Sequence, residues 1–109
     1  MPLNKALLEK TMQHIVDNPD NHNQTVWLTT FDCDTVACLA GWACVLHKPD
    51  FDWFNNLNSL NVRREIPEKA RLYLGLSDDE AMVLFFSGNT IDDLQRYVKM
   101  LLNGEDITI

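Results

Sequence analysis

Basic residues are scarce in this sequence, and long hydrophobic runs are missing altogether. Nine Lys and Arg stand against sixteen Asp and Glu in 109 residues, which gives a formal net charge of −7. Phosphate binding depends on clustered Lys and Arg, so this balance argues against a nucleic-acid-binding protein. No apolar run approaches the roughly 18–20 residues of a membrane span, and the first residues lack the apolar core of a signal peptide. We therefore expect neither nucleic acid nor a membrane as a partner.

Cysteines are few and odd in number, at Cys33, Cys38 and Cys44. That count argues against a disulfide scaffold, and without a secretion signal it predicts buried, reduced thiols in a cytoplasmic protein. Glycine and proline occur only four times each, and we find no repeat or flexible linker. The length therefore fits a single domain that spans residues 1–109.

The periodicity of the apolar residues predicts five helices with clear stop signals between them. We expect them at residues 3–18, at residues 35–47, from Pro67 to Gly75, from Ser77 to Phe86, and from Thr90 to Gly104. Residues 25–31 are β-prone, but no partner strand is evident, so we expect at most one short extended segment. The predicted fold class is all-α, a single small domain of about five helices.

The second of these helices, at residues 35–47, is predicted to form the buried centre of the domain. Its interior, residues 36–46, carries no charge, and a helix that is apolar on all sides is normally buried. Gly41 costs roughly 1 kcal/mol relative to alanine inside a helix. We expect the compensation to be the close approach of another segment of backbone to Gly41.

Residues 70–80 resemble the helix–glycine–helix turn of bacterial DNA-binding domains. The position of Gly75 differs from that motif, however, and the second helix would open with three carboxylates at residues 78–80. We interpret the segment as an ordinary corner between two helices. In this interpretation Ser77 and Glu80 form a capping box at the start of the second helix.

Four possible zinc ligands lie close together in the sequence: Cys33, Cys38, Cys44 and His47. Only Cys44 and His47 have the short spacing that is usual within a pair of structural zinc ligands. If residues 35–47 form one helix, Cys38 and His47 point to opposite faces, so the four cannot converge. We predict no metal and no cofactor, with a small zinc-binding domain as the alternative.

Cys33 stands just before the helix expected at residues 35–47, where the helix dipole lowers the pKa of a thiol. Residues 31–33 resemble the cysteine site of bacterial cell-wall cysteine peptidases, whose helix begins with an Asp-Cys-Ser-Gly-like motif. Here Asp34 and Thr35 replace Ser-Gly, no sheet is predicted to supply a histidine, and flanking aspartates raise the thiol pKa. We predict that the protein is not an enzyme, with a cysteine hydrolase using Cys33 as the alternative.

A cluster of aromatic residues flanked by acidic ones lies in the least regular stretch of the sequence. Its members are Phe51, Trp53 and Phe54, with Asp50 and Asp52 beside them. Aromatic anchors are typical of protein-binding hot spots, and the carboxylates would favour a basic patch on the partner. We predict a partner-binding surface here; the alternative is that the aromatics cover the core as a lid.

Residues 27–43 contain a Trp followed by Cys-x-Thr-x-x-Cys-x-Ala-Gly-Trp-Ala. With this pattern, in which His can replace the second Trp, the sequence resembles a set of small uncharacterised proteins from bacteriophages and bacteria. A later Leu-Gly-Leu-(Ser/Thr) and Ala-x-x-Leu-Phe are matched by residues 74–77 and 81–85, whereas Asp34 replaces the expected Gly. The resemblance implies no known activity and no functional residue, only a phage-related accessory protein in the cytoplasm. The predicted function is therefore non-enzymatic binding of another protein.

Overall fold

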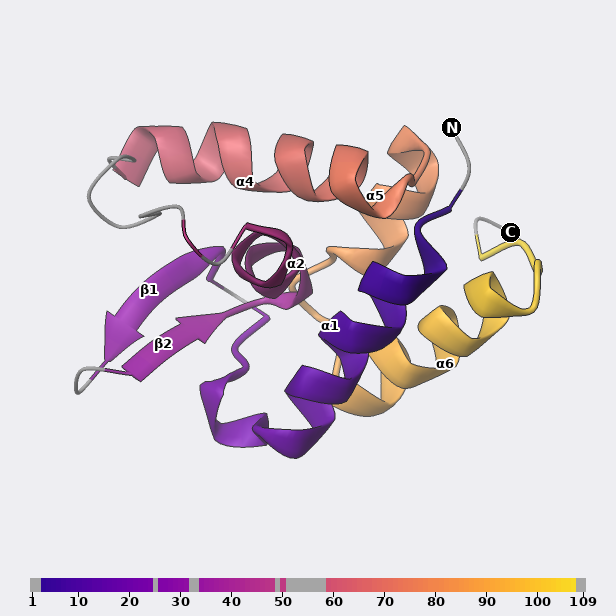
Figure 1. Ribbon diagram of the computed structural model, residues 1–109, viewed down its shortest axis with the longest axis horizontal. Coiled ribbons are helices and arrows are strands. Elements are labelled where there is room, and N and C mark those ends of the chain that lie inside the picture. Colours follow the sequence, from indigo (N-terminus) through magenta and orange to yellow (C-terminus); the bar gives the residue numbers. More distant parts are fainter. Residues whose placement is uncertain (1–2, 25, 32–33, 49, 51–58, 108–109) are drawn as a thin grey trace.

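The computed structural model describes residues 3–24, 26–31, 34–48, 50 and 59–107. Within these ranges the chain forms five α-helices, one short 3-10 helix and two strands (Figure 1). In chain order the elements are α1 (Lys5–Asp17), η1 (Pro19–Asn21), β1 (Leu28–Phe31), β2 (Asp34–Ala37), α2 (Leu39–His47), α4 (Ser59–Leu74), α5 (Asp78–Leu84) and α6 (Ile91–Leu102). The protein is mostly helical, and the predicted all-α class with about five helices is confirmed.

The main departure from the predicted fold is a small β-hairpin. β1 and β2 pair in antiparallel fashion, with Leu28 opposite Ala37 at the open end. Residues 35–37 belong to β2, so the expectation that they begin a helix was wrong, and β1 does have a partner strand. The physical reason lies in the uncharged run at residues 36–46. A continuous apolar run shows neither the strand period nor the helix period, so its two parts could not be told apart.

α2 is the central helix of the fold and is seen end-on in the middle of Figure 1. α1 and α4 both pack against it. Every residue from Leu39 to Cys44 is buried, which leaves only the last turn of α2 partly open to solvent. The prediction of a buried central helix is confirmed for residues 39–44.

Gly41 of α2 lies against the backbone of the segment that leads into β1. A Cβ atom on Gly41 would lie 1.7 Å from the carbonyl oxygen of Trp27 and 2.7 Å from the Cβ of Ala37. Neither contact is compatible with a side chain at this position. The predicted close approach of another backbone segment is confirmed, and it places the backbone of Trp27 in contact with the central helix.

α4 is longer than predicted, and Pro67 lies in its interior instead of at its start. We expected the helix to begin at Pro67 because a proline lacks the N–H that the helix interior needs. The asparagines among residues 55–61 also lowered the helical propensity upstream. Packing of α4 against α2 outweighs both effects. The end of α4 is as predicted, because Gly75 follows it with a φ of 72°.

α5 and α6 begin with capping boxes. The hydroxyl of Ser77 accepts the N–H of Glu80 at 3.1 Å, and the Glu80 carboxylate accepts the N–H of Ser77 at 2.8 Å. Thr90 and Asp93 form the same reciprocal pair at the start of α6. The predicted corner after Gly75 is therefore confirmed, and it fixes the position of α5 beside α4.

Candidate functional site

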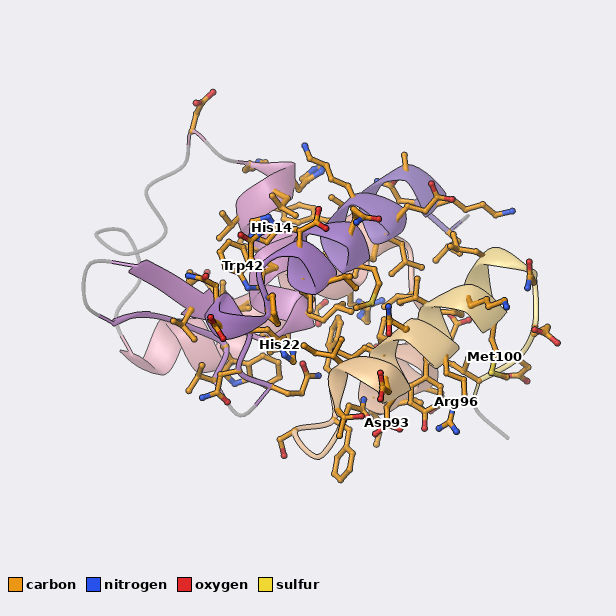
Figure 2. All side chains as sticks on the ribbon, turned by 90° about the horizontal axis from the view of Figure 1, so that it is seen from below. His14, His22, Trp42, Asp93, Arg96 and Met100 are labelled. Carbon is orange, nitrogen blue, oxygen red and sulfur yellow. The ribbon has the colours of Figure 1, made fainter. Side chains whose placement is uncertain are left out.

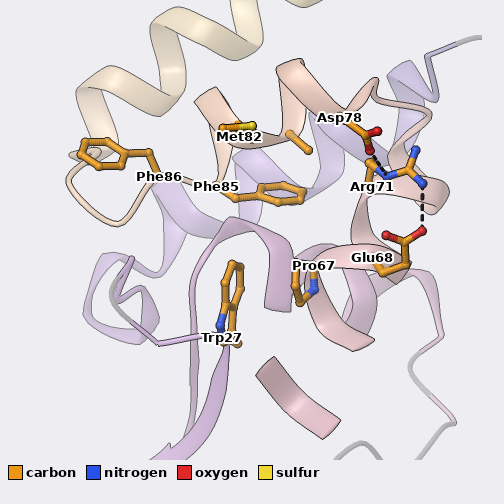
Figure 3. Close-up of a pocket in the computed structure, with 9 residues that line it drawn as sticks. Trp27, Pro67, Glu68, Arg71, Asp78, Met82, Phe85 and Phe86 are labelled. Atoms are coloured by element: carbon orange, nitrogen blue, oxygen red, sulfur yellow. Dashed lines mark hydrogen bonds and ion pairs between the residues drawn. The ribbon is translucent and has the colours of Figure 1, made fainter. Parts of the chain in front are cut away.

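A surface groove of about 400 Å³ lies between α4, α5 and the segment that precedes β1 (Figure 3). We call it the α4–α5 groove. Its lining is mostly apolar, with three charged side chains at one end, and consists of Trp27, Pro67, Glu68, Arg71, Asp78, Ala81, Met82, Phe85 and Phe86. In Figure 3 the charged side chains and Phe86 lie on opposite sides of Met82, with Trp27 below.

The apolar rim of the groove comes from the short helix α5 and the residues just after it. Ala81, Leu84 and Phe85 point into the core and are buried, as expected for residues three and four apart on one helix face. Met82 and Phe86 point away from the core, and their exposed fractions are 73% and 61%. The run from Ala81 to Phe86 therefore carries more apolar surface than the core can cover.

The charged end of the groove is built around Arg71 of α4. Its Nη2 lies 2.8 Å from a carboxylate oxygen of Glu68, and its Nε lies 3.1 Å from Oδ1 of Asp78. The hydrogen bond to Glu68, and then the nearby charges of Glu68 and Asp78, raise the pKa of Arg71. A third guanidinium nitrogen, Nη1, donates to the carbonyl of Leu76 at 3.4 Å. Among the described lining residues, Arg71 is the one cation beside two carboxylates, and it is engaged by groups of its own chain.

The end of α5 is anchored by a buried amide, that of Gln24. Its Oε1 accepts the N–H of Leu39 at 3.3 Å, and its Nε2 donates to the carbonyl of Leu84 at 3.1 Å. Nε2 of His22 lies 2.8 Å from the same Oε1, and because that oxygen can only accept, Nε2 of His22 carries a hydrogen. Asn89 also donates to the carbonyl of Leu84, at 3.2 Å. Gln24 therefore ties the start of α2 to the end of α5.

The two described thiols are poorly suited to chemistry. Burial raises the pKa of Cys38 to about 11 and that of Cys44 to about 12, so both stay protonated near neutral pH. The Sγ of Cys44 donates to the carbonyl of Ile66 at 3.5 Å, whereas the Sγ of Cys38 lies 3.9 Å from the carbonyl oxygen of Trp27. Both thiols act as small core residues.

The four possible zinc ligands of the alternative interpretation are not brought together in the part of the chain that the structure describes. Cys33 lies outside the described residues, and His47 lies at the exposed end of α2, its ring 4.2 Å from that of Tyr73. Among the described residues, no group of three or more His, Cys, Asp and Glu side chains could hold a metal ion. Cys33, the nucleophile of the alternative enzyme, likewise has no described position.

A histidine of α1, His14, packs against Trp42 of the central helix. The ring of His14 lies 4.2 Å from that of Trp42, whose Nε1 donates to the carbonyl of Asn21 at 3.0 Å (Figure 2). Nε2 of His14 is buried and finds no hydrogen-bond partner among the described residues. This burial lowers the pKa of His14, although Asp17 acts in the opposite direction. The pair belongs to the packing of α1 on α2, away from the groove.

Most of the residues predicted to bind a partner lie outside the described residues, namely Phe51, Asp52, Trp53 and Phe54. The fifth, Asp50, is exposed. The α4–α5 groove itself was not predicted from the sequence. Its signal was the unbroken apolar run at residues 81–86, because a short helix with one buried face cannot cover all six side chains.

Comparisons of the chain with protein-family models, with curated proteins and with solved structures find no match. Across the described ranges, none of the helices is long and apolar enough to cross a membrane. A function must therefore be inferred from the groove and its chemistry.

Proposed function

We propose that the protein is a small, acidic, non-enzymatic protein that binds another protein, and that the α4–α5 groove is its binding surface. The observation that carries this proposal is the exposure of Met82 and Phe86 on the rim of an apolar groove. Exposed apolar surface that lines a depression is typical of interaction sites. Aromatic residues and methionine are also enriched where proteins bind one another.

The polar groups of the groove also favour binding over catalysis. Arg71 already has carboxylate and carbonyl partners from its own chain. The described thiols are protonated core residues, so neither offers a nucleophile to the groove. What the groove offers to a ligand is apolar surface and the free lone pairs of two partly exposed carboxylates.

We propose further that the protein acts in a cytoplasm, the host's if the gene belongs to a bacteriophage. The free thiols of Cys38 and Cys44 support a reducing compartment, and the sequence resemblance supports the phage-related role. Phe51, Trp53 and Phe54, with Asp50 and Asp52, are retained as a second part of the partner surface. Their support is their composition alone.

Met82→Glu tests the proposed surface, because glutamate keeps the helical propensity of α5 while it charges the rim. Tagged wild type and variant are used to capture proteins from a bacterial lysate, with identification by mass spectrometry. We expect one stoichiometric partner, whose recovery falls about tenfold or more with Met82→Glu, as for a hot-spot residue.

The matched control is Leu72→Glu, which charges an exposed apolar residue of α4 that does not line the groove. It should leave recovery of the partner unchanged, and far-UV circular dichroism should be the same for all three proteins. Equal recovery with wild type and Met82→Glu would contradict the assignment of the groove as the binding surface.

A further inference from the structure

We infer that the occupant of the α4–α5 groove is a segment of a partner protein that carries a large apolar side chain beside a lysine or arginine. This inference rests on the proposed function, which it narrows to one class of ligand.

The size and openness of the groove suit a side chain presented by a polypeptide. Its volume of about 400 Å³ lies near the lower end of the range for small ligand sites, enough for one or two large side chains. Small-molecule sites bury most of their ligand, whereas here Met82 and Phe86 stand on the rim and are largely exposed. An occupant that also covers the rim must extend beyond the groove, as a peptide segment does.

The charges at the other end select for a basic ligand. Glu68 and Asp78 share one cation, Arg71, and their side chains are 59% and 86% exposed. The described lining residues therefore carry one negative charge in excess, and their carboxylate oxygens can accept further hydrogen bonds. Among the lining residues that the structure describes, a ligand carboxylate or phosphate would find no second cation. It would have to displace Glu68 or Asp78 from Arg71.

The charge of the whole chain acts in the same direction. At a net charge of −7 the protein attracts basic segments and speeds their association at low ionic strength. It also repels a second copy of itself, which carries the same charge. The occupant that fits both ends of the groove is therefore an apolar anchor next to a Lys or Arg, supplied by another protein.

The test is selection from a random linear-peptide library displayed on a carrier, with wild type as bait and an excess of the Met82→Glu variant as competitor. The competitor removes peptides that bind elsewhere on the chain. We expect the selected peptides to combine a large apolar residue with Lys or Arg. Their dissociation constants are then measured with the double variant Glu68→Gln/Asp78→Asn, which keeps shape and hydrogen-bonding groups but removes both charges.

We expect the double variant to bind these peptides about threefold more weakly or worse, because exposed charge pairs contribute modestly. The charge-matched control is Asp92→Asn/Glu105→Gln, which removes two exposed carboxylates that do not line the groove. It should change the affinity less than the groove variant does. A peptide in which the Lys or Arg is replaced by glutamine should bind wild type and groove variant equally.

The possible failures have different meanings. The inference is overturned if the groove-dependent peptides show no excess of Lys or Arg. It is also overturned if both double variants change the peptide affinities alike. In either case the groove remains a binding surface. If no peptide requires Met82, both the inference and the proposed function are overturned. A groove-dependent dimer of the wild-type protein in sedimentation experiments would also overturn the inference, since a second copy would then be the occupant.

Discussion

Gly41 and Trp27 meet at a point where the core and the α4–α5 groove share one contact. The missing side chain of Gly41 leaves room for the carbonyl group of Trp27, and the indole of Trp27 lines the groove (Figure 3). A change in side-chain size at Gly41 would therefore move Trp27 and alter the lining of the groove.

Gly41→Ala should destabilise the protein and disturb the groove together. The new Cβ would stand 1.7 Å from the Trp27 carbonyl oxygen, so the backbone of Trp27 must move. Overpacking of this kind costs about 1–3 kcal/mol, more than the helical propensity of alanine returns. Urea denaturation should show the lower free energy of unfolding, and binding of any groove ligand should weaken.

Gly104→Ala is the control, because a Cβ on Gly104 meets nothing within 4 Å and the only penalty is its φ of +79°. That strain costs about 1–2 kcal/mol and lies beyond the end of α6. Ligand binding should be unaffected. If Gly41→Ala were as stable as wild type, the close contact with Trp27 would not exist in solution.

Gln24→Leu should lower the free energy of unfolding by more than the small change in side-chain volume suggests. The leucine has nearly the same volume, but the N–H of Leu39 loses its side-chain acceptor. The carbonyl of Leu84 loses one of its side-chain donors. A buried polar group that loses its partner costs about 1–3 kcal/mol. The decrease in the free energy of unfolding is measured by urea denaturation, with Gln95→Leu on the exposed face of α6 as control.

The control should change the free energy of unfolding by less than about 0.5 kcal/mol, as is usual for surface substitutions. A Gln24→Leu protein as stable as this control would mean that the amide does not join α2 to α5. Amide exchange at Leu39 gives a second, local measure, since its protection should fall in Gln24→Leu.

Local signals in the sequence were sufficient for several parts of the fold. The close approach at Gly41 was predicted from the glycine alone, without its partner Trp27. The capping box of Ser77 and Glu80 and the stop at Gly75 each depend on one or two residues and their immediate neighbours. These features were predicted because short-range backbone chemistry determines them.

The remaining parts depend on contacts between distant segments. Pairing of β2 with β1 turns residues 35–37 into a strand, although their composition fits a buried helix equally well. The interior position of Pro67 is tolerated because α4 packs on α2. The groove combines Trp27 with α4 and α5, and no short-range pattern could place these three segments together.

The pairing of His14 with Trp42 predicts a pH dependence of stability. Burial lowers the pKa of His14 in the folded protein, so the unfolded chain binds a proton there more readily. The folded state therefore has its full stability above the ordinary histidine pKa of about 6.5 and loses part of it as the pH falls below that value.

His14→Phe keeps a ring next to Trp42 and removes this titration. Urea midpoints measured at about pH 7 and pH 5 should fall less in the variant than in wild type. The hydrogen bond from the Thr90 backbone lowers the pKa of Asp93. The interval from pH 7 to pH 5 therefore lies above the range in which Asp93 begins to take up protons. An equal decrease in both proteins would show that His14 does not titrate differently on unfolding.

The thiols of Cys38 and Cys44 should resist alkylation in the native protein. Their pKa values of about 11 and about 12 leave very little thiolate near neutral pH, and both side chains are fully buried. Iodoacetamide should label both at least roughly a hundredfold more slowly than a free cysteine, Cys44 more slowly still, and at the ordinary rate once urea unfolds the chain. Peptide mass spectrometry resolves the labelling of each residue.

The same experiment near pH 6 tests the enzyme alternative at Cys33. A nucleophilic thiol has a lowered pKa and reacts selectively there, whereas a thiol beside Asp32 and Asp34 is expected to react slowly. A Cys33→Ser variant identifies the signal from that residue. Fast, selective labelling of Cys33 would favour a cysteine hydrolase over the binding protein proposed above. Fast labelling of Cys38 or Cys44 would instead contradict their burial next to Trp27 and Ile66.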